Sequence, residues 1–171
     1  MLMALEKSGF MLSFFSRLTR QHWVLIALFI VIFDQLSKFL MTCYLLPSTR
    51  VELLPGFDLV LRFNTGAAFS LLADGSGWQR WLFIVLAIGM SALLYYCLSK
   101  VPPEKPLESL GLTCVLGGAI GNLIDRVLQG YVTDFILLYY RHWEWPAFNI
   151  ADSAICVGVA LLVPTLFRKN I

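Results

Sequence analysis

Four long apolar runs dominate this 171-residue sequence and decide what it can fold into. A helix needs about 20 residues to cross the hydrocarbon core of a bilayer, and the runs cover about 23–46, 80–99, 107–125 and 148–167. Charged residues make up 14% of the chain, whereas soluble domains have roughly 25%. We therefore predict an α-helical polytopic membrane protein with four transmembrane helices, forming a single membrane-embedded domain over 1–171. A water-soluble globule is excluded.

Charge and cysteine usage exclude other classes. The net charge of +2 is too small to predict a nucleic-acid partner. The cysteines lie far apart, in or beside apolar runs, without the spacing of a metal site, so we interpret them as small buried hydrophobes and expect no metal or cofactor. They are Cys43, Cys97, Cys114 and Cys156.

Basic residues beside the apolar runs predict the orientation, because they accumulate on the cytoplasmic side. Those that flank the runs on one side are Arg17, Arg20, Lys100, Lys105, Arg168 and Lys169. We expect both termini to be cytoplasmic and the loops 47–79 and 126–147 to face outward. Arg50, Arg62 and Arg80 in the first outer loop run against this rule, partly offset by Glu52, Asp58 and Asp74.

The outer loops carry patterns of their own. Alternate residues from 57 to 63 are apolar, the period of a half-buried strand. Residues 51–54 are a possible partner strand, with Pro55 and Gly56 as the turn. This predicts a small extracytoplasmic β-sheet. The aromatic segment 135–145 is expected as an interfacial loop or helix, with an ordinary aromatic belt as the simpler interpretation.

Polar residues inside apolar runs are expensive and need partners. Asp34 and Lys38 are four residues apart on one helix face, which predicts an internal ion pair supported by hydrogen bonds from Gln35 and Ser37. In this interpretation the ion pair stabilises the structure and has no role in function.

The third run ends in a second polar group. Asp125 and Arg126 predict a salt bridge at the helix end, and Asn122 is either an interhelical hydrogen bonder or a site residue. The small residues Gly117 and Gly121 permit close helix contact in lipid.

Two further aspartates are expected to meet. Asp134 precedes the aromatic segment and Asp152 begins the fourth run, so the chain returns both to the same outer level. Two carboxylates at one low-dielectric boundary tend to share a proton, leaving one acid and one base. This is the equipment of an aspartic hydrolase, although a proton or ion path would use the same residues.

Other chemistries find little support in the sequence. There is no HExxH zinc motif and no GxSxG nucleophile motif. A small ion- or proton-translocating membrane subunit stays an alternative, as does a structural assembly factor without catalysis.

Five blocks together resemble the motifs of the lipoprotein signal peptidase family (signal peptidase II), in that family's order. They are DQLSK at 34–38, NTGAAFS at 64–70, GGAIGNLIDR at 117–126, VTDF at 132–135 and FNIADS at 148–153. Thr133 is a departure, since a second valine is expected there.

The resemblance implies an aspartic endopeptidase of the bacterial inner membrane, active at the periplasmic side, that cleaves prolipoproteins just before the diacylglyceryl-modified cysteine. It carries the catalytic pair over onto Asp134 and Asp152. Site-shaping or substrate-binding roles carry over onto Asp34, Lys38, Asn64, Gly66, Asn122, Asp125, Arg126 and Asn149. Expected partners are lipid-modified prolipoproteins and membrane phospholipid, with the enzyme acting as a monomer and without metal or organic cofactor.

The position of Asp152 suggests its charge state. A helix N-terminus favours a negative charge by about 0.3–1 kcal/mol. We therefore expect Asp152 to be the ionised partner and Asp134 to carry the proton in the resting enzyme.

Overall fold

The computed structural model describes residues 18–46, 49–66 and 77–167. The helices are α2 (Arg20–Tyr44), α3 (Trp78–Lys100), α4 (Pro106–Leu128) and α5 (Ile150–Phe167), and the strands are β1 (Arg50–Leu54), β2 (Phe57–Asn64), β3 (Val132–Tyr140) and β4 (Trp143–Glu144). Part of the NTGAAFS block (67–70) and the flanking residues Arg17, Asp74, Arg168 and Lys169 lie outside the described residues.

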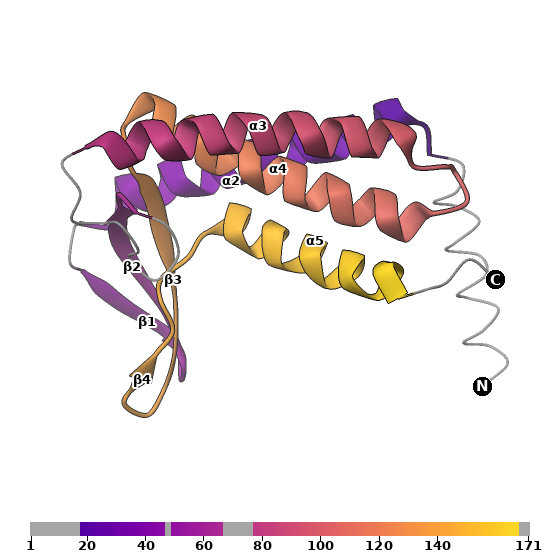
Figure 1. Ribbon diagram of the computed structural model, residues 1–171. Coiled ribbons are helices and arrows are strands. Elements are labelled where there is room, and N and C mark those ends of the chain that lie inside the picture. The colour runs from indigo at the N-terminus through magenta and orange to yellow at the C-terminus, as the bar shows by residue number, and fades with distance from the viewer. Residues whose placement is uncertain (1–17, 47–48, 67–76, 168–171) are drawn as a thin grey trace, which may run out of the picture.

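The described helices run antiparallel as one bundle, with the sheet at one end (Figure 1). The start of α2, the α3–α4 connection and the end of α5 share the other end. α2, α3 and α4 are long and apolar enough to cross a membrane, and α5 is a shorter apolar helix. The four apolar helices therefore form where the sequence predicts them.

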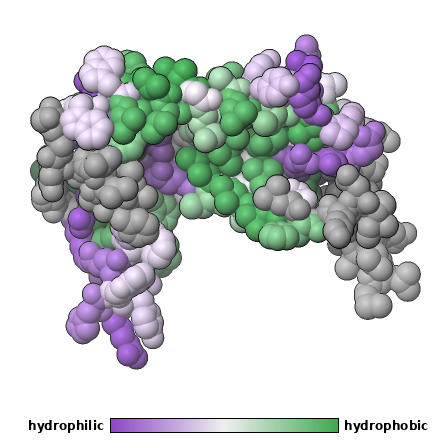
Figure 2. All heavy atoms as spheres, in the orientation of Figure 1, coloured by the Kyte–Doolittle hydropathy of each residue, from purple (hydrophilic) through white to green (hydrophobic). Residues whose placement is uncertain are grey.

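The outer surface of the bundle is apolar. Side chains such as Phe29 and Phe39 of α2 and Val85 of α3 are each more than 60% exposed. Figure 2 shows a hydrophobic band over the helices, with hydrophilic groups gathered toward the two ends. In water this exposure would be costly, whereas lipid is a suitable solvent for it.

α4 is the central helix and packs against the other three. Its glycines allow close approach: a Cβ on Gly117 would lie 2.9 Å from the Cβ of Ile30 in α2, and one on Gly118 would run into the Ala151 carbonyl of α5. The prediction that small residues bring helices together is confirmed. These contacts place the polar end of α4 directly between α2 and α5.

The sheet is antiparallel in the order β1-β2-β3-β4. β1 and β2 confirm the two predicted strands, and Gly56 adopts a positive φ of 89° in the turn between them. The side chains buried in β2 are Asp58, Val60 and Leu61, not simply the apolar alternates. The pairing register shifts between Leu59 and Arg62, and this irregularity interrupts the period-two alternation.

The aromatic segment 135–145 is not an interfacial loop or helix, which corrects the prediction. It forms β3 and β4, with Arg141 at a positive φ of 56° in the turn. The free edge of β2 offers hydrogen-bond partners that a strand satisfies. Aromatic and β-branched residues suit strands as well as interfaces, so composition alone did not separate the two.

The basic residues that run against the charge rule have structural partners. Arg80 donates to the carbonyls of Arg126 (2.9 Å) and Val127 (2.8 Å) at the end of α4. Arg50 pairs with Asp58 and Glu144. Their positions are therefore explained by local packing, and they need not report the orientation of the chain.

Candidate active site

Asp134 and Asp152 meet where the sheet joins the helix bundle. Asp134 lies on β3 and Asp152 in the first turn of α5. Both line one cavity of about 930 Å³. The two acids are close enough for the negative charge of Asp152 to raise the pKa of Asp134. The expected meeting of two acids distant in the sequence therefore occurs.

The local sequence at the start of α5 fixes Asp152. The amide N–H of Asp152 donates to the Oδ1 of Asn149 (2.9 Å), and the N–H of Asn149 donates back to the Oδ2 of Asp152 (3.3 Å). This is a reciprocal capping box, here built from Asn and Asp. The same two residues that begin the helix therefore hold the carboxylate at its N-terminus.

Two asparagines hold Asp134. The Nδ2 of Asn149 donates to Oδ1 of Asp134 (2.8 Å), and the Nδ2 of Asn64 donates to Oδ2 (3.3 Å). The amide of Asn64 is itself oriented, because its Oδ1 accepts the N–H of Gly66 (3.0 Å). Asp134 therefore has a defined orientation despite lying on a strand at the cavity wall.

A third asparagine links the two carboxylates. The Nδ2 of Asn122 donates to Oδ1 of Asp152 (2.8 Å), and its Oδ1 accepts from Asn149 (3.2 Å). Asn122 is thus an interhelical hydrogen bonder, as one of the two alternatives predicted, and it also lines the cavity.

Burial raises the pKa of Asp134 to about 7, and the neighbouring charge of Asp152 adds to the increase. The side chain of Asp134 is only 3% exposed. Hydrogen bonds from Asn64 and Asn149 oppose the effect without cancelling it. Asp134 is therefore protonated in a substantial fraction of molecules near pH 7, which is what a general acid requires.

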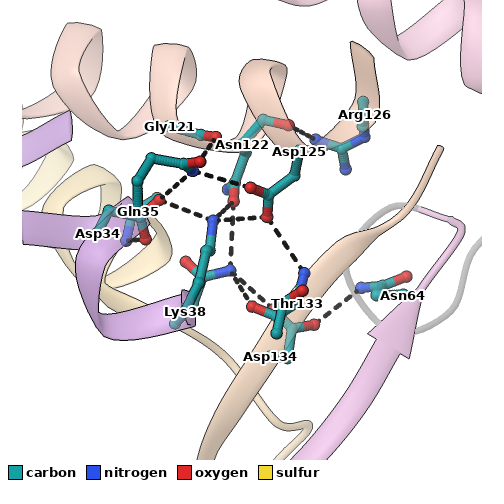
Figure 3. A network of polar contacts seen from close by, with 12 residues as sticks. Asp34, Gln35, Lys38, Asn64, Gly121, Asn122, Asp125, Arg126, Thr133 and Asp134 are labelled. Carbon is teal, nitrogen blue, oxygen red and sulfur yellow. Dashed lines mark hydrogen bonds and ion pairs between the residues drawn. The ribbon is translucent and has the colours of Figure 1, made fainter. Parts of the chain in front are cut away.

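A second pair of carboxylates lies behind the cavity, in a buried ion cluster formed by Asp34, Lys38 and Asp125 (Figure 3). The Nζ of Lys38 lies 2.7 Å from Oδ2 of Asp34 and 2.8 Å from Oδ2 of Asp125. The predicted Asp34–Lys38 pair is confirmed. Gln35 donates to Asp34 as expected and also to Asp125, which was not predicted, whereas Ser37 donates to the backbone carbonyl of Asp34.

The expected salt bridge between Asp125 and Arg126 is not the one that forms. Asp125 pairs with Lys38 and accepts the N–H of Thr133 (3.2 Å). Arg126 donates to the carbonyls of Gly66 (3.2 Å) and Asn122 (3.4 Å). Successive helical residues point about 100° apart, so Asp125 faces α2 while Arg126 faces the cavity.

The ion cluster also connects to α5. Oδ1 of Asp34 accepts the N–H of Ala151 (2.8 Å), one of the donors that a helix N-terminus leaves unpaired. A Cβ on Gly121 would lie 2.7 Å from Oδ2 of Asp34, so a glycine is needed beside it. The cluster thus joins α2, α4 and α5 directly behind the two catalytic candidates.

The structure divides the predicted site residues into two groups. Those that line the cavity are Asn64, Asn122, Arg126, Asp134 and Asp152. Those that support them from behind are Asp34, Lys38, Gly66, Asp125 and Asn149.

Sequence reasoning missed the apolar wall of the cavity, which includes Leu138, Trp145, Phe148 and Ile155. Ile155 lies three residues after Asp152 on the same helix face, so helical spacing was a usable signal for it. The others come together only because residues 145 and 148 form backbone hydrogen bonds to β3. It also missed Thr133, whose N–H and C=O both bond to site residues.

Comparison with known proteins agrees with this geometry. The profile of the family described as signal peptidase (SPase) II matches residues 26–168. A lipoprotein signal peptidase of Teredinibacter turnerae is 50% identical over 141 residues, covering 82% of this chain and 84% of the relative. One from Pseudomonas aeruginosa is 45% identical over 156 residues, covering 90% and 92%.

Solved structures agree as well. Two structures described as a bacterial membrane enzyme have TM-scores of 0.78 and 0.77 at 31% identity. Each covers 88% of this chain, and 93% and 95% of the solved chains respectively. The family resemblance, the apolar helices and the paired acids are therefore consistent, and the chain belongs to the signal peptidase II family of bacterial membrane proteases.

Proposed function

We propose that this chain is an aspartic endopeptidase that removes the signal peptide of prolipoproteins just before the lipid-modified cysteine, using Asp134 and Asp152. Its relatives are named lipoprotein signal peptidases. The observation that carries the catalytic assignment is that these two carboxylates line one cavity and that burial and the charge of Asp152 raise the pKa of Asp134 to about 7.

In this mechanism Asp152 is the general base. It accepts hydrogen bonds from Asn122 and from the N–H of Asn149, and it lies at a helix N-terminus, where negative charge is favoured. It takes a proton from water as the water oxygen bonds to the scissile carbonyl carbon. Asp134 gives its proton to the carbonyl oxygen, which forms a neutral tetrahedral intermediate.

Collapse of the intermediate completes the reaction. The C–N bond breaks, the proton held by Asp152 passes to the leaving amine, and Asp134 regains its proton from the intermediate's hydroxyl. Both acids return to their starting states, so the cycle balances without a cofactor.

The remaining cavity residues suit substrate binding. Asn64 and Arg126 offer hydrogen-bond donors for a substrate backbone, and the apolar side chains of Leu138, Trp145 and Phe148 suit a hydrophobic signal segment or acyl chains. A lipid-anchored substrate reaches this cavity along the apolar surface of the helices.

The family and the apolar helices indicate a multi-pass protein of the bacterial inner membrane. For the orientation in this membrane, we propose that the sheet end and the active site face the periplasm and that both termini are cytoplasmic. The start of α2 and the end of α5 lie at the end of the bundle opposite the sheet (Figure 1), as four crossings require. Monomeric action and contact with phospholipid also stay predictions.

An ion- or proton-translocating subunit is not supported. Such a relay would use Asp34, Lys38 and Asp152, but Lys38 is held by ion pairs to both Asp34 and Asp125. The relatives are peptidases.

Cleavage of a lipid-modified precursor peptide by the purified protein in detergent tests the proposal. Asp134→Asn and Asp152→Asn should each lower kcat by at least about 1,000-fold, because each removes one proton-transfer group. The matched control is Asp58→Asn, the same change at a buried aspartate of β2 that does not line the cavity. It should stay within about tenfold of the parent.

Cleavage retained in either variant of the pair would contradict the assignment and direct attention to Asp125. Absence of cleavage by the unmodified chain, while a related lipoprotein signal peptidase cleaves the same peptide, would contradict the proposed function itself.

A further inference from the structure

Lys38 occupies a position that substrate binding does not explain. Its side chain is 5% exposed, and it is not among the described residues that line the cavity. Its ammonium group has three N–H bonds, and three acceptors surround it. They are Oδ2 of Asp34 at 2.7 Å, Oδ2 of Asp125 at 2.8 Å and Oδ1 of Asn122 at 3.0 Å.

The third acceptor connects Lys38 to the reacting groups. An ammonium group donates and never accepts hydrogen bonds, so Asn122 must turn its oxygen toward Lys38. The NH₂ group of the same amide then points the other way, and it donates to Oδ1 of Asp152 at 2.8 Å. The reversed amide would place an oxygen against the carboxylate of Asp152 and NH₂ against the ammonium.

Asn149 also donates to the oxygen of Asn122, but less exclusively. Its Nδ2 is shared among Asn122 (3.2 Å), the carbonyl of Thr133 (3.3 Å) and Asp134 (2.8 Å). Lys38 is therefore the charged and shorter donor to this oxygen, and charge-assisted hydrogen bonds are roughly twice as strong as neutral ones.

We propose that Lys38 is a positioning residue that fixes the amide of Asn122, so that its NH₂ group is always presented to Asp152. This inference rests on the proposed function, because it concerns how the base of that reaction is held. The ion pairs with Asp34 and Asp125 keep the lysine itself in place.

Other charges facing Asp152 must be considered with it. Asp134 faces it from β3 and Arg126 from α4, and Asp125 lies behind Asn122 on α4. None of these bonds to the amide oxygen of Asn122. Among the donors that the described residues supply to that oxygen, only Lys38 is charged.

Steady-state cleavage by variants of the full chain tests the proposal. Lys38→Met removes the donor. The double variant Lys38→Met with Asp34→Asn removes it as well, but keeps the formal charge of the ion cluster at −1. This second variant provides a folded protein if the single variant is unstable. Both should lower kcat by about 10- to 100-fold and leave KM unchanged, since misplaced catalytic groups slow chemistry without weakening binding.

Two readouts separate positioning from a merely structural role. Asn122→Leu should lower kcat by a similar factor, and adding it to the Lys38 variant should cost little more, because both changes break one chain of contacts. The acidic limb of the pH–rate profile should also move to higher pH in the Lys38 variants. Without Lys38, the amide of Asn122 is no longer held with its NH₂ group toward the charged form of Asp152.

The matched control is Lys105→Met, the same substitution at an exposed lysine that pairs with Glu108 at the other end of α4. It should leave both kcat and the pH profile unchanged. An increase in KM with kcat retained would show that Lys38 binds substrate and would overturn the proposal. So would fully additive effects of the Lys38 and Asn122 changes, or an unmoved acidic limb.

These failures differ from failure of the proposed function. If Asp152→Asn abolishes cleavage while the Lys38 variants behave like the parent, the peptidase assignment stands and the positioning role is wrong. If Asp152→Asn cleaves normally, both are wrong.

Discussion

The protein contains two neighbouring pairs of carboxylates, Asp34 with Asp125 and Asp134 with Asp152, in which every acid except the half-buried Asp152 is buried. Asp34 and Asp125 are joined by the ammonium of Lys38 at 2.7 and 2.8 Å. Asp134 and Asp152 share asparagine neighbours and a cavity. Within the described ranges, neither of the latter two makes an ion pair.

The difference lies in what occupies the space between the acids. A lysine lies between the acids of the first pair and forms an ion pair with each, so both acids are held by one charged partner, and the group joins three helices. Among the described residues, the groups that donate hydrogen bonds to the second pair are neutral amides. Burial and the neighbouring charge then let one acid retain a proton. The same residue type is therefore structural in one place and suited to catalysis a few ångströms away.

The largest effect is expected when the same substitution, Asp to Asn, is made in each pair and the stability of the two variants is compared. Asp125→Asn should lower the free energy of unfolding by about 1.5–3 kcal/mol, because it replaces the charged contacts to Lys38 and to the N–H of Thr133 by weaker neutral ones, while Asp34 still pairs with Lys38. Asp134→Asn should lower it little or raise it, because it removes a carboxyl group that burial disfavours. Thermal unfolding in detergent at pH 8 measures both. Equal destabilisation by the two changes would remove the distinction between the pairs.

A lysine placed beside the second pair should make it resemble the first. Asn64→Lys puts an ammonium group next to Asp134, which Asn64 contacts at 3.3 Å. The added charge favours the ionised acid, so cleavage at pH 7 should fall by about 100-fold. Asn64→Met is the uncharged control of similar length and should lose less activity. A Lys variant as active as the Met variant would contradict the assigned proton on Asp134.

The pH dependence of cleavage follows from the raised pKa of Asp134. Its pKa of about 7 lies above the ordinary 3.8, so the acid is protonated below about pH 7 and ionised above. Cleavage should therefore fall about tenfold per pH unit on the alkaline side. The free energy of unfolding should also decrease as the pH rises from 3.8 to 7, because in this range the folded state binds a proton on Asp134 that the unfolded state has lost. A flat rate profile from pH 6 to 9 would show that Asp134 is not the acid.

The smallest effect concerns the packing that holds the pairs together. Gly121→Ala introduces a Cβ 2.7 Å from Oδ2 of Asp34 and should cost about 1–3 kcal/mol of stability. Gly89→Ala on α3 meets nothing within 4 Å and should stabilise the protein by up to about 1 kcal/mol. Unfolding temperatures in one detergent compare them, and a Gly121→Ala protein as stable as the parent would mean that the ion cluster adjusts freely.

Much of this site was predictable from the sequence. The ion pair of Asp34 and Lys38 followed from their spacing of four residues on a helix, and the meeting of Asp134 with Asp152 from the length of chain between two membrane crossings. The family motifs identified the same residues. The partner of Asp125 was not predictable, because adjacent helical positions face different neighbours and only packing shows which.

The sequence alone determined the apolar helices, the first hairpin and the residue types of the site, because each depends on hydrophobicity, period or spacing along one segment. Only the tertiary structure decided that 135–145 belongs to the strands β3 and β4, that Lys38 bonds to Asn122, and that, among the described residues, one pair of acids forms ion pairs with a lysine whereas the other forms none. Those features arise between segments that are distant in the chain, and hydrogen-bond partners across such distances are chosen by how the helices pack at their glycines and how the sheet pairs.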